Sequence, residues 1–240
     1  MNSPHAFWSR RHFLLHDPLR FSQPGPDEFT PQYWLDRQAV TGQSHGRGVT
    51  YFVQQGQQHW VLRHYRRGGL IGKLIHDRYL YTGIARCRPV AEFRLLQQLH
   101  QQGLPVPRPI GAHVHKVGLW YRGDLLIERI DGARDLVAWL QQQPLSEMQW
   151  QAVGQLLRRF HDAGVYHADL NSHNILMNDA KALWLIDFDR GAVRAPGVWQ
   201  EDNLARLLRS LNKEQQRLSP FYWQQQRDWP ALMAGYEKGA

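Results

Sequence analysis

The most informative stretch of the sequence reads Tyr166-His167-Ala168-Asp169-Leu170-Asn171-Ser172-His173-Asn174, and Leu185-Ile186-Asp187-Phe188-Asp189 follows it after a turn. The two stretches lie in a predicted succession of helix, short strand, loop and hairpin. Within that succession, Asp169, Asn174 and Asp187 supply two carboxylates and one amide, and such oxygens suit a hard cation. The alternative interpretation is that Asp169 and Asn174 only cap turns.

The spacing H-x-D-x-x-x-x-N, followed by D-F on the next strand, resembles the catalytic and metal-binding pair of the protein-kinase fold. This resemblance implies that Asp169 orients and deprotonates the hydroxyl of an acceptor. It also implies that Asn174 and Asp187 hold Mg²⁺ against the phosphates of ATP. His167 is expected to pack the loop rather than to act as a second base.

The nucleotide-binding half of the pattern is less regular. Gly46 and Gly48 precede a strand and resemble a Gly-rich phosphate loop, although a plain hairpin turn explains them equally well. Arg63 stands where protein kinases usually have Lys, and it is expected to pair with the phosphates and with Glu92. Lys73 is an alternative for that role. Glu92 has its own alternative, as an acidic residue that the dipole of the following helix favours.

Two further departures from protein kinases bear on the acceptor. Ala168 replaces the usual Arg, which removes a docking point for a phosphorylated activation loop, and Asp189 replaces the usual Gly. The segment between Asp187 and Asp202 is short and contains no Ser, Thr or Tyr. A phosphorylation-switched loop and a protein substrate are therefore disfavoured, and a small-molecule or lipid acceptor is expected.

The order of predicted elements indicates the fold class. Strands are predicted at 49–53 and 59–65, helices after Pro89 and after a capping box at Ser146 and Gln149, and mostly helix from Glu201 onward. Strands thus dominate the first half and helices the second. This order predicts an α+β, bilobal arrangement with a cleft between the lobes. The resemblance of the motifs implies that the fold is protein-kinase-like and that ATP binds in the cleft. The expected parts are an N-terminal extension (1–27), an N-lobe (28–127) and a C-lobe (128–240).

Composition narrows the class of protein. Lys and Arg number 29 against 21 Asp and Glu, a net charge of +8, and 24 of the 29 are Arg. Arg pairs bidentately with phosphate and carboxylate, so anionic partners are expected. Cys87 is the single cysteine, which fits a reducing compartment. No apolar run is long enough to span a membrane, and no signal peptide is recognised, so a cytoplasmic protein is expected.

Several stretches resemble the 3-deoxy-D-manno-octulosonic acid (Kdo) kinases of Gram-negative bacteria. They are 62–70 (LRHYRRGGL), 92–96 (EFRLL), 103–107 (GLPVP), 166–171 (YHADLN) and 184–191 (WLIDFDRG). This resemblance implies transfer of the γ-phosphate of ATP to the 4-hydroxyl of Kdo on lipid A precursor. The reaction would belong to lipopolysaccharide core synthesis, at the cytoplasmic face of the inner membrane.

The resemblance and the charge together define the expected partners. They are the Kdo-bearing lipid A precursor and the anionic surface of the inner membrane, with no obligate protein partner. Residues 8–20 mix apolar and basic side chains and either rest at that surface or pack on the N-lobe. Nucleic acid is not expected, because no recognised binding motif accompanies the charge. Rival interpretations are a heptose or aminoglycoside-type kinase and an inactive kinase-like binding module.

Overall fold

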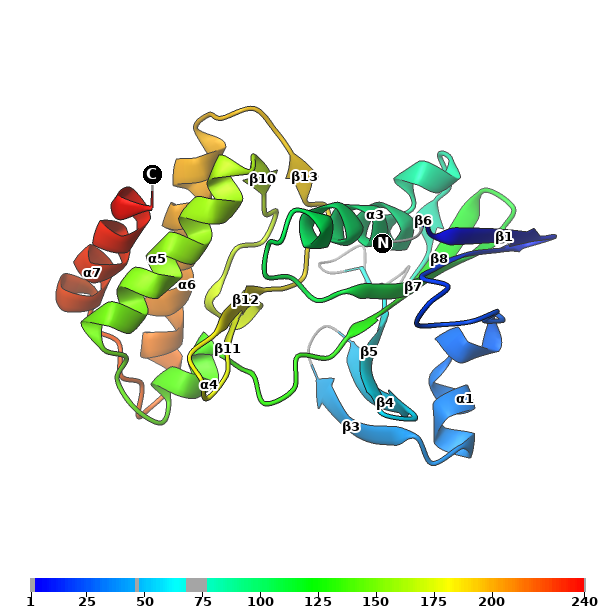
Figure 1. Cartoon of the computed structure of the whole chain (residues 1–240), viewed down its shortest axis with the longest axis horizontal. Helices are drawn as coiled ribbons and strands as arrows, with labels where there is room; N and C mark the ends of the chain where they lie inside the picture. The colour runs from blue at the N-terminus through cyan, green and yellow to red at the C-terminus, as the bar shows by residue number, and fades with distance from the viewer. Residues whose placement is uncertain (1–2, 46–47, 68–76, 240) are drawn as a thin grey trace. The chain divides into compact units, whose positions relative to one another are not determined.

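The computed structural model describes residues 3–45, 48–67 and 77–239. The chain divides into two compact units (Figure 1). The first unit comprises Met1–Gln101 and Pro107–Ile130, and the second comprises Gln102–Val106 and Asp131–Ala240. A large antiparallel sheet dominates the first unit, whereas helices dominate the second, so the predicted mixture of strands and helices is confirmed.

The first unit is built on an antiparallel sheet of eight strands in the described part of the chain. Its strands are β1 (His5–Ser9), β2 (His12–His16), β3 (Val40–His45), β4 (Val49–Gln55), β5 (Gln58–His64), β6 (Tyr79–Leu80), β7 (Pro109–Val117) and β8 (Trp120–Glu128). Their order is β1-β2-β7-β8-β5-β4-β3, with β6 paired to β8. The predicted hairpin at Gly56 is β4–β5, where Gly56 takes a φ of 59° that suits glycine.

The N-terminal segment differs from the expectation. Residues 1–27 were expected to form an extension, yet β1 and β2 belong to the sheet, and β2 pairs with β7. Phe13, Leu14 and Leu15 are buried, so these three side chains cannot rest on a membrane surface. A strand that is covered on both faces shows no alternation of apolar and polar residues, so its sequence lacks the usual strand signal.

Short helices and α3 complete the first unit. They are η1 (Asp27–Phe29), α1 (Pro31–Asp36), η2 (Ile84–Arg86) and α3 (Arg88–Gln101). The predicted stripe of α3 is confirmed, since Val90, Phe93, Leu96 and Leu99 are at most 1% exposed. On the sheet, Phe21, Phe29 and Trp34 pack with Trp60, Leu62 and Leu126 in one core cluster. Helix and sheet thereby bury the apolar residues that drive this unit to fold.

The second unit is mainly helical. Its helices are α4 (Leu136–Leu140), α5 (Glu147–Asp162), α6 (Trp199–Arg217) and α7 (Gln225–Lys238). Its strands are β9 (Arg134–Asp135), β11 (Ile175–Met177) and β12 (Leu183–Leu185) in one sheet, and β10 (Val165–Tyr166) with β13 (Ala192–Val193) in another. The 3-10 helix η3 (Ser172–Asn174) precedes β11. The capping box of α5 and the β11–β12 hairpin agree with the sequence-based prediction.

Two glycines let α5 and α7 pack closely. A Cβ atom on Gly154 would lie 2.0 Å from the carbonyl oxygen of Leu232, and one on Gly235 would lie 2.0 Å from that of Gln151. No larger residue fits at either position without moving a helix. Among the described residues, no helix combines the length and the apolar character that crossing a membrane requires.

Candidate active site

His167 anchors the loop that leads from β10 to η3. The amide of Asp169 donates to Nδ1 of His167 at 3.2 Å, so the ring proton sits on Nε2 and is donated to the carbonyl of Ile186 at 2.9 Å. Burial lowers the pKa of His167, which keeps the ring neutral in this role. The prediction that His167 packs the loop is therefore confirmed, and the ring ties Asp169 to the residue before Asp187.

The carbonyl of Asp169 is a second fixed point of the loop. It accepts hydrogen bonds from Nδ2 of Asn171 at 3.0 Å and from Nδ2 of Asn174 at 2.9 Å. Asn171 is the residue that caps η3, since its side chain accepts from the amide of His173. The carboxylate of Asp169 is 39% exposed and faces Arg206 at 3.4 Å. The structure therefore presents this carboxylate at the surface, where an acceptor hydroxyl can reach it.

Asp187 lies at the end of the β11–β12 hairpin in an unusual backbone conformation. Its φ is 63°, a left-handed value that costs free energy for any residue other than glycine. The amide of Ile186 donates to the carbonyl of Asn174 at 3.0 Å, and Phe188 is fully buried against His167 and Phe160. These contacts hold the backbone on both sides of Asp187 in place.

Asn174 and Asp187 offer the oxygen donors that Mg²⁺ prefers. Asn174 donates through Nδ2 to Asp169, and its Oδ1 accepts no hydrogen bond from the described residues. The described part of the chain contains no group of three or more His, Cys, Asp or Glu that could hold a metal ion. Mg²⁺ commonly takes one or two protein ligands and completes its shell with phosphates and water. The donor set therefore fits Mg²⁺ that arrives with a nucleotide.

Two residues of α6 support the loop, and the sequence-based prediction missed both. Asn203 binds both backbone groups of His167, accepting from the amide at 3.2 Å and donating to the carbonyl at 3.0 Å. Arg206, three residues later, contacts Asp169. Residues three apart share a helix face, so one face of α6 reaches the loop twice. No local pattern marks this contact, because the helix is about thirty-five residues away in sequence.

In the first unit, Arg63 of β5 and Glu92 of α3 form the predicted ion pair. Glu92 is 2% exposed, and it also accepts a hydrogen bond of 2.5 Å from the hydroxyl of Tyr65. Arg63 in turn donates to that hydroxyl at 3.1 Å. Glu92 lies beyond the first turn of α3, so a first-turn dipole effect does not explain it. The roles of Arg63 and Glu92 toward a nucleotide stay predictions.

The other predicted nucleotide-binding residues are only partly described. Gly46 and Lys73 lie outside the described residues. Gly48 lies just before β4, in the turn that joins it to β3, and a Cβ atom there would lie 2.7 Å from the side chain of Arg66. The Arg66 side chain is exposed and flexible, so this approach does not by itself require a glycine. A hairpin turn and a phosphate loop remain equally compatible with Gly48.

A chain of titratable residues crosses four strands of the first unit, and sequence analysis did not single it out. Asp124 on β8 contacts His64 on β5 at 2.6 Å and His113 on β7 at 3.1 Å, and His113 contacts His12 on β2 at 2.9 Å. Burial opposes the charge of Asp124, but the hydrogen bonds of His113 and His64 outweigh it and lower its pKa. Burial likewise opposes the charge of His64, whereas Asp124 and Asp77 raise its pKa.

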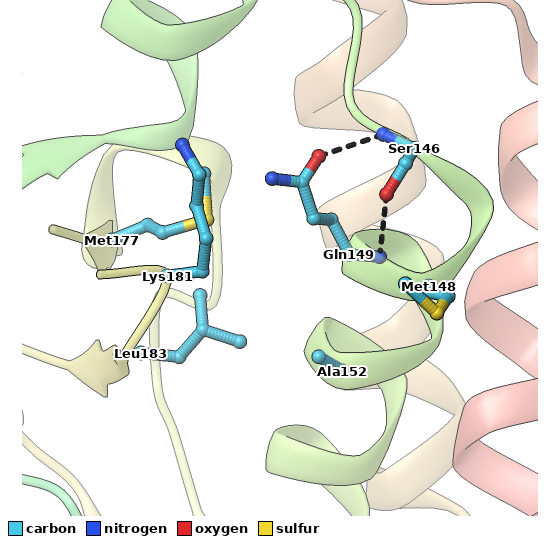
Figure 2. Close-up of a pocket in the computed structure, with 7 residues that line it drawn as sticks. All are labelled: Ser146, Met148, Gln149, Ala152, Met177, Lys181 and Leu183. Atoms are coloured by element: carbon cyan, nitrogen blue, oxygen red, sulfur yellow. Dashed lines mark hydrogen bonds between the residues drawn. The ribbon is translucent and has the colours of Figure 1, made fainter. Parts of the chain in front are cut away.

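The second unit also contains a pocket of about 300 Å³ that is separate from these residues. Figure 2 shows it between the first turn of α5 and the β11–β12 hairpin. Ser146 and Gln149 of the capping box line one side, and Met177 and Lys181 line the other. None of the lining residues belongs to the loop around Asp169, so the pocket is not part of the candidate active site.

Comparison with known proteins identifies similar sequences over most of the chain. A family model described as "Lipopolysaccharide kinase (Kdo/WaaP) family" matches residues 31–236. The 3-deoxy-D-manno-octulosonic acid kinase of Vibrio parahaemolyticus serotype O3:K6 is 50% identical over 84% of this chain and 82% of its own. The enzyme of the same name from Vibrio vulnificus is 45% identical over 93% and 94%, and that from Actinobacillus succinogenes is 43% identical over 91% and 95%.

Proposed function

The chain belongs to the lipopolysaccharide kinase (Kdo/WaaP) family, and from this premise we propose that it transfers the γ-phosphate of ATP to the 4-hydroxyl of Kdo on a lipid A precursor. The observation that carries the proposal is 43–50% identity to Kdo kinases over most of both chains. The chain is accordingly a phosphotransferase that acts on a sugar hydroxyl in lipopolysaccharide core synthesis.

Asp169 acts on the acceptor in this proposal. Its partly exposed carboxylate orients the sugar hydroxyl and takes its proton while the hydroxyl oxygen bonds to the γ-phosphorus. The bond from that phosphorus to the bridging oxygen breaks, and ADP leaves. The hydrogen bonds from Asn171 and Asn174 support this role, because they hold the backbone of Asp169 and thus the start of its side chain.

Asn174 and Asp187 hold Mg²⁺ in this proposal. The fixed orientation of the Asn174 amide, which donates through Nδ2 to Asp169, and the constrained backbone of Asp187 support the assignment. The ion, when bound, neutralises the charge of the nucleotide phosphates. Arg63 is proposed to contact those phosphates, since its guanidinium is oriented by Glu92 and Tyr65. Gly46 and Gly48 are proposed to line the same nucleotide.

The division into two units supports a finer proposal about the fold. The family resemblance of the sequence motifs suggests that these units are the two lobes of a protein-kinase-like fold and that ATP binds in the cleft. Arg63 and Glu92 belong to the first unit, and Asp169, Asn174 and Asp187 belong to the second. A nucleotide that needs both groups of residues would have to contact both units.

The place of action follows from the acceptor. A lipid A precursor is embedded in a membrane, so the enzyme is proposed to act as a peripheral protein at the cytoplasmic face of the inner membrane. The net charge of +8 supports association with anionic lipid there. No obligate protein partner and no nucleic acid are part of the proposal.

The decisive experiment measures transfer of labelled γ-phosphate from Mg-ATP to Kdo-bearing lipid A precursor. Asp169→Asn should abolish transfer and leave ATP binding unchanged, because it removes the base and not a nucleotide contact. Asp187→Asn should instead weaken Mg-ATP binding. The matched control is Asp179→Asn, a carboxylate 82% exposed, which should keep the activity of the wild type.

The outcomes separate the rival functions. Transfer to a heptosylated acceptor or an aminoglycoside, with none to Kdo-lipid, would overturn the proposed acceptor. Bound ATP without transfer to any acceptor would make the chain a binding module instead of an enzyme.

A further inference from the structure

One end of the sheet in the first unit exposes large apolar side chains. Phe7 and Trp8 of β1 are 55% and 52% exposed, and Leu80 of β6 is 54% exposed. Around the turn between β7 and β8, Val117 is 51%, Leu119 is 73% and Trp120 is 39% exposed. These six residues are half of the large apolar side chains that are exposed in the described part of the chain. Such a concentration at one end marks an interaction surface.

Backbone pairing brings these residues together. The amide of Lys116 donates to the carbonyl of Arg11 at 2.7 Å, which joins the β7–β8 turn to the β1–β2 turn. Leu80 pairs with Trp120, and the amide of Tyr81 donates to the carbonyl of Leu119 at 2.9 Å. Figure 1 shows β1, β6 and the turn between β7 and β8 at the same end of the unit.

The exposed side chains surround this end instead of forming one flat face. Phe7 and Trp8 are neighbours on a strand, so they point to opposite faces of the sheet. Leu119 stands in the turn itself, between Val117 on one strand and the start of the other. A protein partner with a flat surface would contact only one face of this end, whereas the lipids of a bilayer can surround all of it. The arrangement therefore suits insertion at a membrane interface.

The segments that build this end carry mainly basic side chains. The segments 3–12, 78–88 and 115–123, which build it, contain seven basic residues and no Asp or Glu: Arg10, Arg11, Arg78, Arg86, Arg88, Lys116 and Arg122. Two acids flank these segments, and both are paired: Asp77 with Arg122 at 2.9 Å, and Asp124 with His64 at 2.6 Å. The ammonium of Lys116 lies over the ring of Tyr81, with 4.6 Å between Nζ and the ring centre. Tyr and Trp beside Arg and Lys are typical of the water–lipid boundary.

We propose that this basic apolar end docks the protein on an anionic phospholipid bilayer, with Phe7, Trp8, Leu119 and Trp120 entering the interface and the Arg side chains contacting lipid phosphates. The proposal rests on the proposed function, since that function requires access to a lipid-anchored sugar. It goes further by assigning membrane contact to the turns of the first unit. The buried Phe13, Leu14 and Leu15 have no part in it.

The test measures binding of the full chain to vesicles that contain neither Kdo-lipid nor ATP. Vesicles of phosphatidylcholine alone are compared with vesicles that also contain phosphatidylglycerol, by flotation. The variants are Leu119→Ser with Trp120→Ser, and Arg10→Gln with Arg11→Gln. The matched controls are Leu35→Ser, 48% exposed on α1, and Arg209→Gln, exposed on α6. Circular dichroism verifies that every variant is folded.

The wild type should bind the anionic vesicles at least about tenfold more tightly than the neutral ones, and added salt should weaken binding. Each double variant should lose about tenfold or more of that affinity, while both controls bind like the wild type. Equal binding to both kinds of vesicle, or wild-type binding by the double variants, would overturn the proposal. Concentration-dependent dimerisation that the Leu119→Ser, Trp120→Ser variant alone loses would assign this end to self-association instead.

A second measurement separates this proposal from the proposed function. With a deacylated, water-soluble Kdo acceptor, the double variants should transfer phosphate at the rate of the wild type. Their rate should be lower than that of the wild type only when the acceptor is in anionic vesicles. Vesicle binding without transfer to either acceptor would contradict the proposed function alone. Transfer to both acceptors at the wild-type rate by every variant would contradict the docking surface alone.

Discussion

The hydroxyl of Tyr65 joins the two members of the Arg63–Glu92 pair. It donates to the buried carboxylate at 2.5 Å and accepts from the guanidinium at 3.1 Å. The ring also lies 4.9 Å from the guanidinium carbon. A long Arg side chain has many rotamers, and contacts of this kind restrict it to few of them. In the proposed function, Tyr65 is therefore a positioning residue that orients Arg63.

We expect Tyr65→Phe to raise KM for ATP several-fold with a smaller change in kcat, because the Arg side chain loses its orientation. The lost hydrogen bond to the buried carboxylate should also lower the free energy of unfolding by about 2 kcal/mol. Steady-state kinetics with varied ATP and denaturant unfolding measure the two effects. Tyr33→Phe is the control, because its hydroxyl makes no hydrogen bond with the described residues. An unchanged KM would contradict the positioning role.

Among the helices and strands, the register of paired strands creates side-chain contacts that the sequence of neither strand predicts by itself. Asp124 meets His64 and His113 because β8 lies between β5 and β7, each in antiparallel register. The helix pair α5–α7 depends in the same way on two glycines, Gly154 and Gly235, that are far apart in sequence. Each element is a local structure, whereas its contacts are a property of the assembled unit.

Asp124→Asn tests the charged pair through pH. Because the pKa of Asp124 is lowered in the folded state, its charged carboxylate stabilises the fold at pH values above the ordinary pKa of 3.8. This stabilisation disappears as pH falls through the lowered pKa. Because the pKa of His64 is raised in the folded state, its protonated ring stabilises the fold at pH values below 6.5. This stabilisation disappears as pH rises through the raised pKa. The free energy of unfolding of the wild type should therefore exceed that of the variant most between pH 3.8 and 6.5, by about 2 kcal/mol.

Urea unfolding of both proteins across pH 3 to 9 measures this difference, with flanking His113, His12 and Asp77 left intact. Asp179→Asn, on an exposed ion pair, should change the free energy of unfolding by less than about 0.5 kcal/mol at any pH. A difference that is flat across the range would refute the charged pair.

Gly154→Ala tests the crossing of α5 and α7. Helix propensity alone would favour alanine by about 1 kcal/mol. The new methyl group would nevertheless meet backbone atoms of Leu232 and Tyr236 at 2.0 and 2.6 Å, which cannot move without shifting α7. The net effect should be a loss of about 2 kcal/mol or more in thermal or urea unfolding. Gln155→Ala, one position along on the exposed side, is the control, and equal stability of the two variants would contradict the close crossing.

For the whole chain, the residues of the proposed function belong to two different units. The first contributes Arg63, Tyr65 and Glu92, and the second contributes Asp169, Asn174 and Asp187. Neither group alone offers both a phosphate contact and a base. Ligand binding should therefore be a property of the full chain.

Mg-ATP should stabilise the full chain by about 2.7 kcal/mol when its concentration is a hundredfold above Kd. Under the same conditions, Glu92→Gln and Asp187→Asn should each lose most of this increment. Glu92→Gln weakens the ion pair that orients Arg63 toward the phosphates, and Asp187→Asn removes a proposed Mg²⁺ ligand of the other unit. Differential scanning calorimetry with and without nucleotide measures it, and Asp179→Asn should retain the full increment. If only the variant of one unit lost the increment, nucleotide binding would not require both units.

The local elements and the motif that points to the chemistry could be predicted from the sequence. The capping box of α5, the Gly56 hairpin and the spacing from His167 to Asp187 depend on near neighbours, so their patterns are visible along the chain. The Arg63–Glu92 pair was foreseen through the family resemblance. These predictions needed no knowledge of packing.

The contacts between distant residues became known from the folded structure. Arg206 and Asn203 reach the loop around Asp169 because α6 packs there, and Tyr65 reaches Glu92 because α3 covers β5. The strand β2 escaped prediction because burial on both faces removes the alternation that identifies a strand. Contacts between distant segments depend on register and on the crossing of elements, and neither leaves a periodic trace in the sequence.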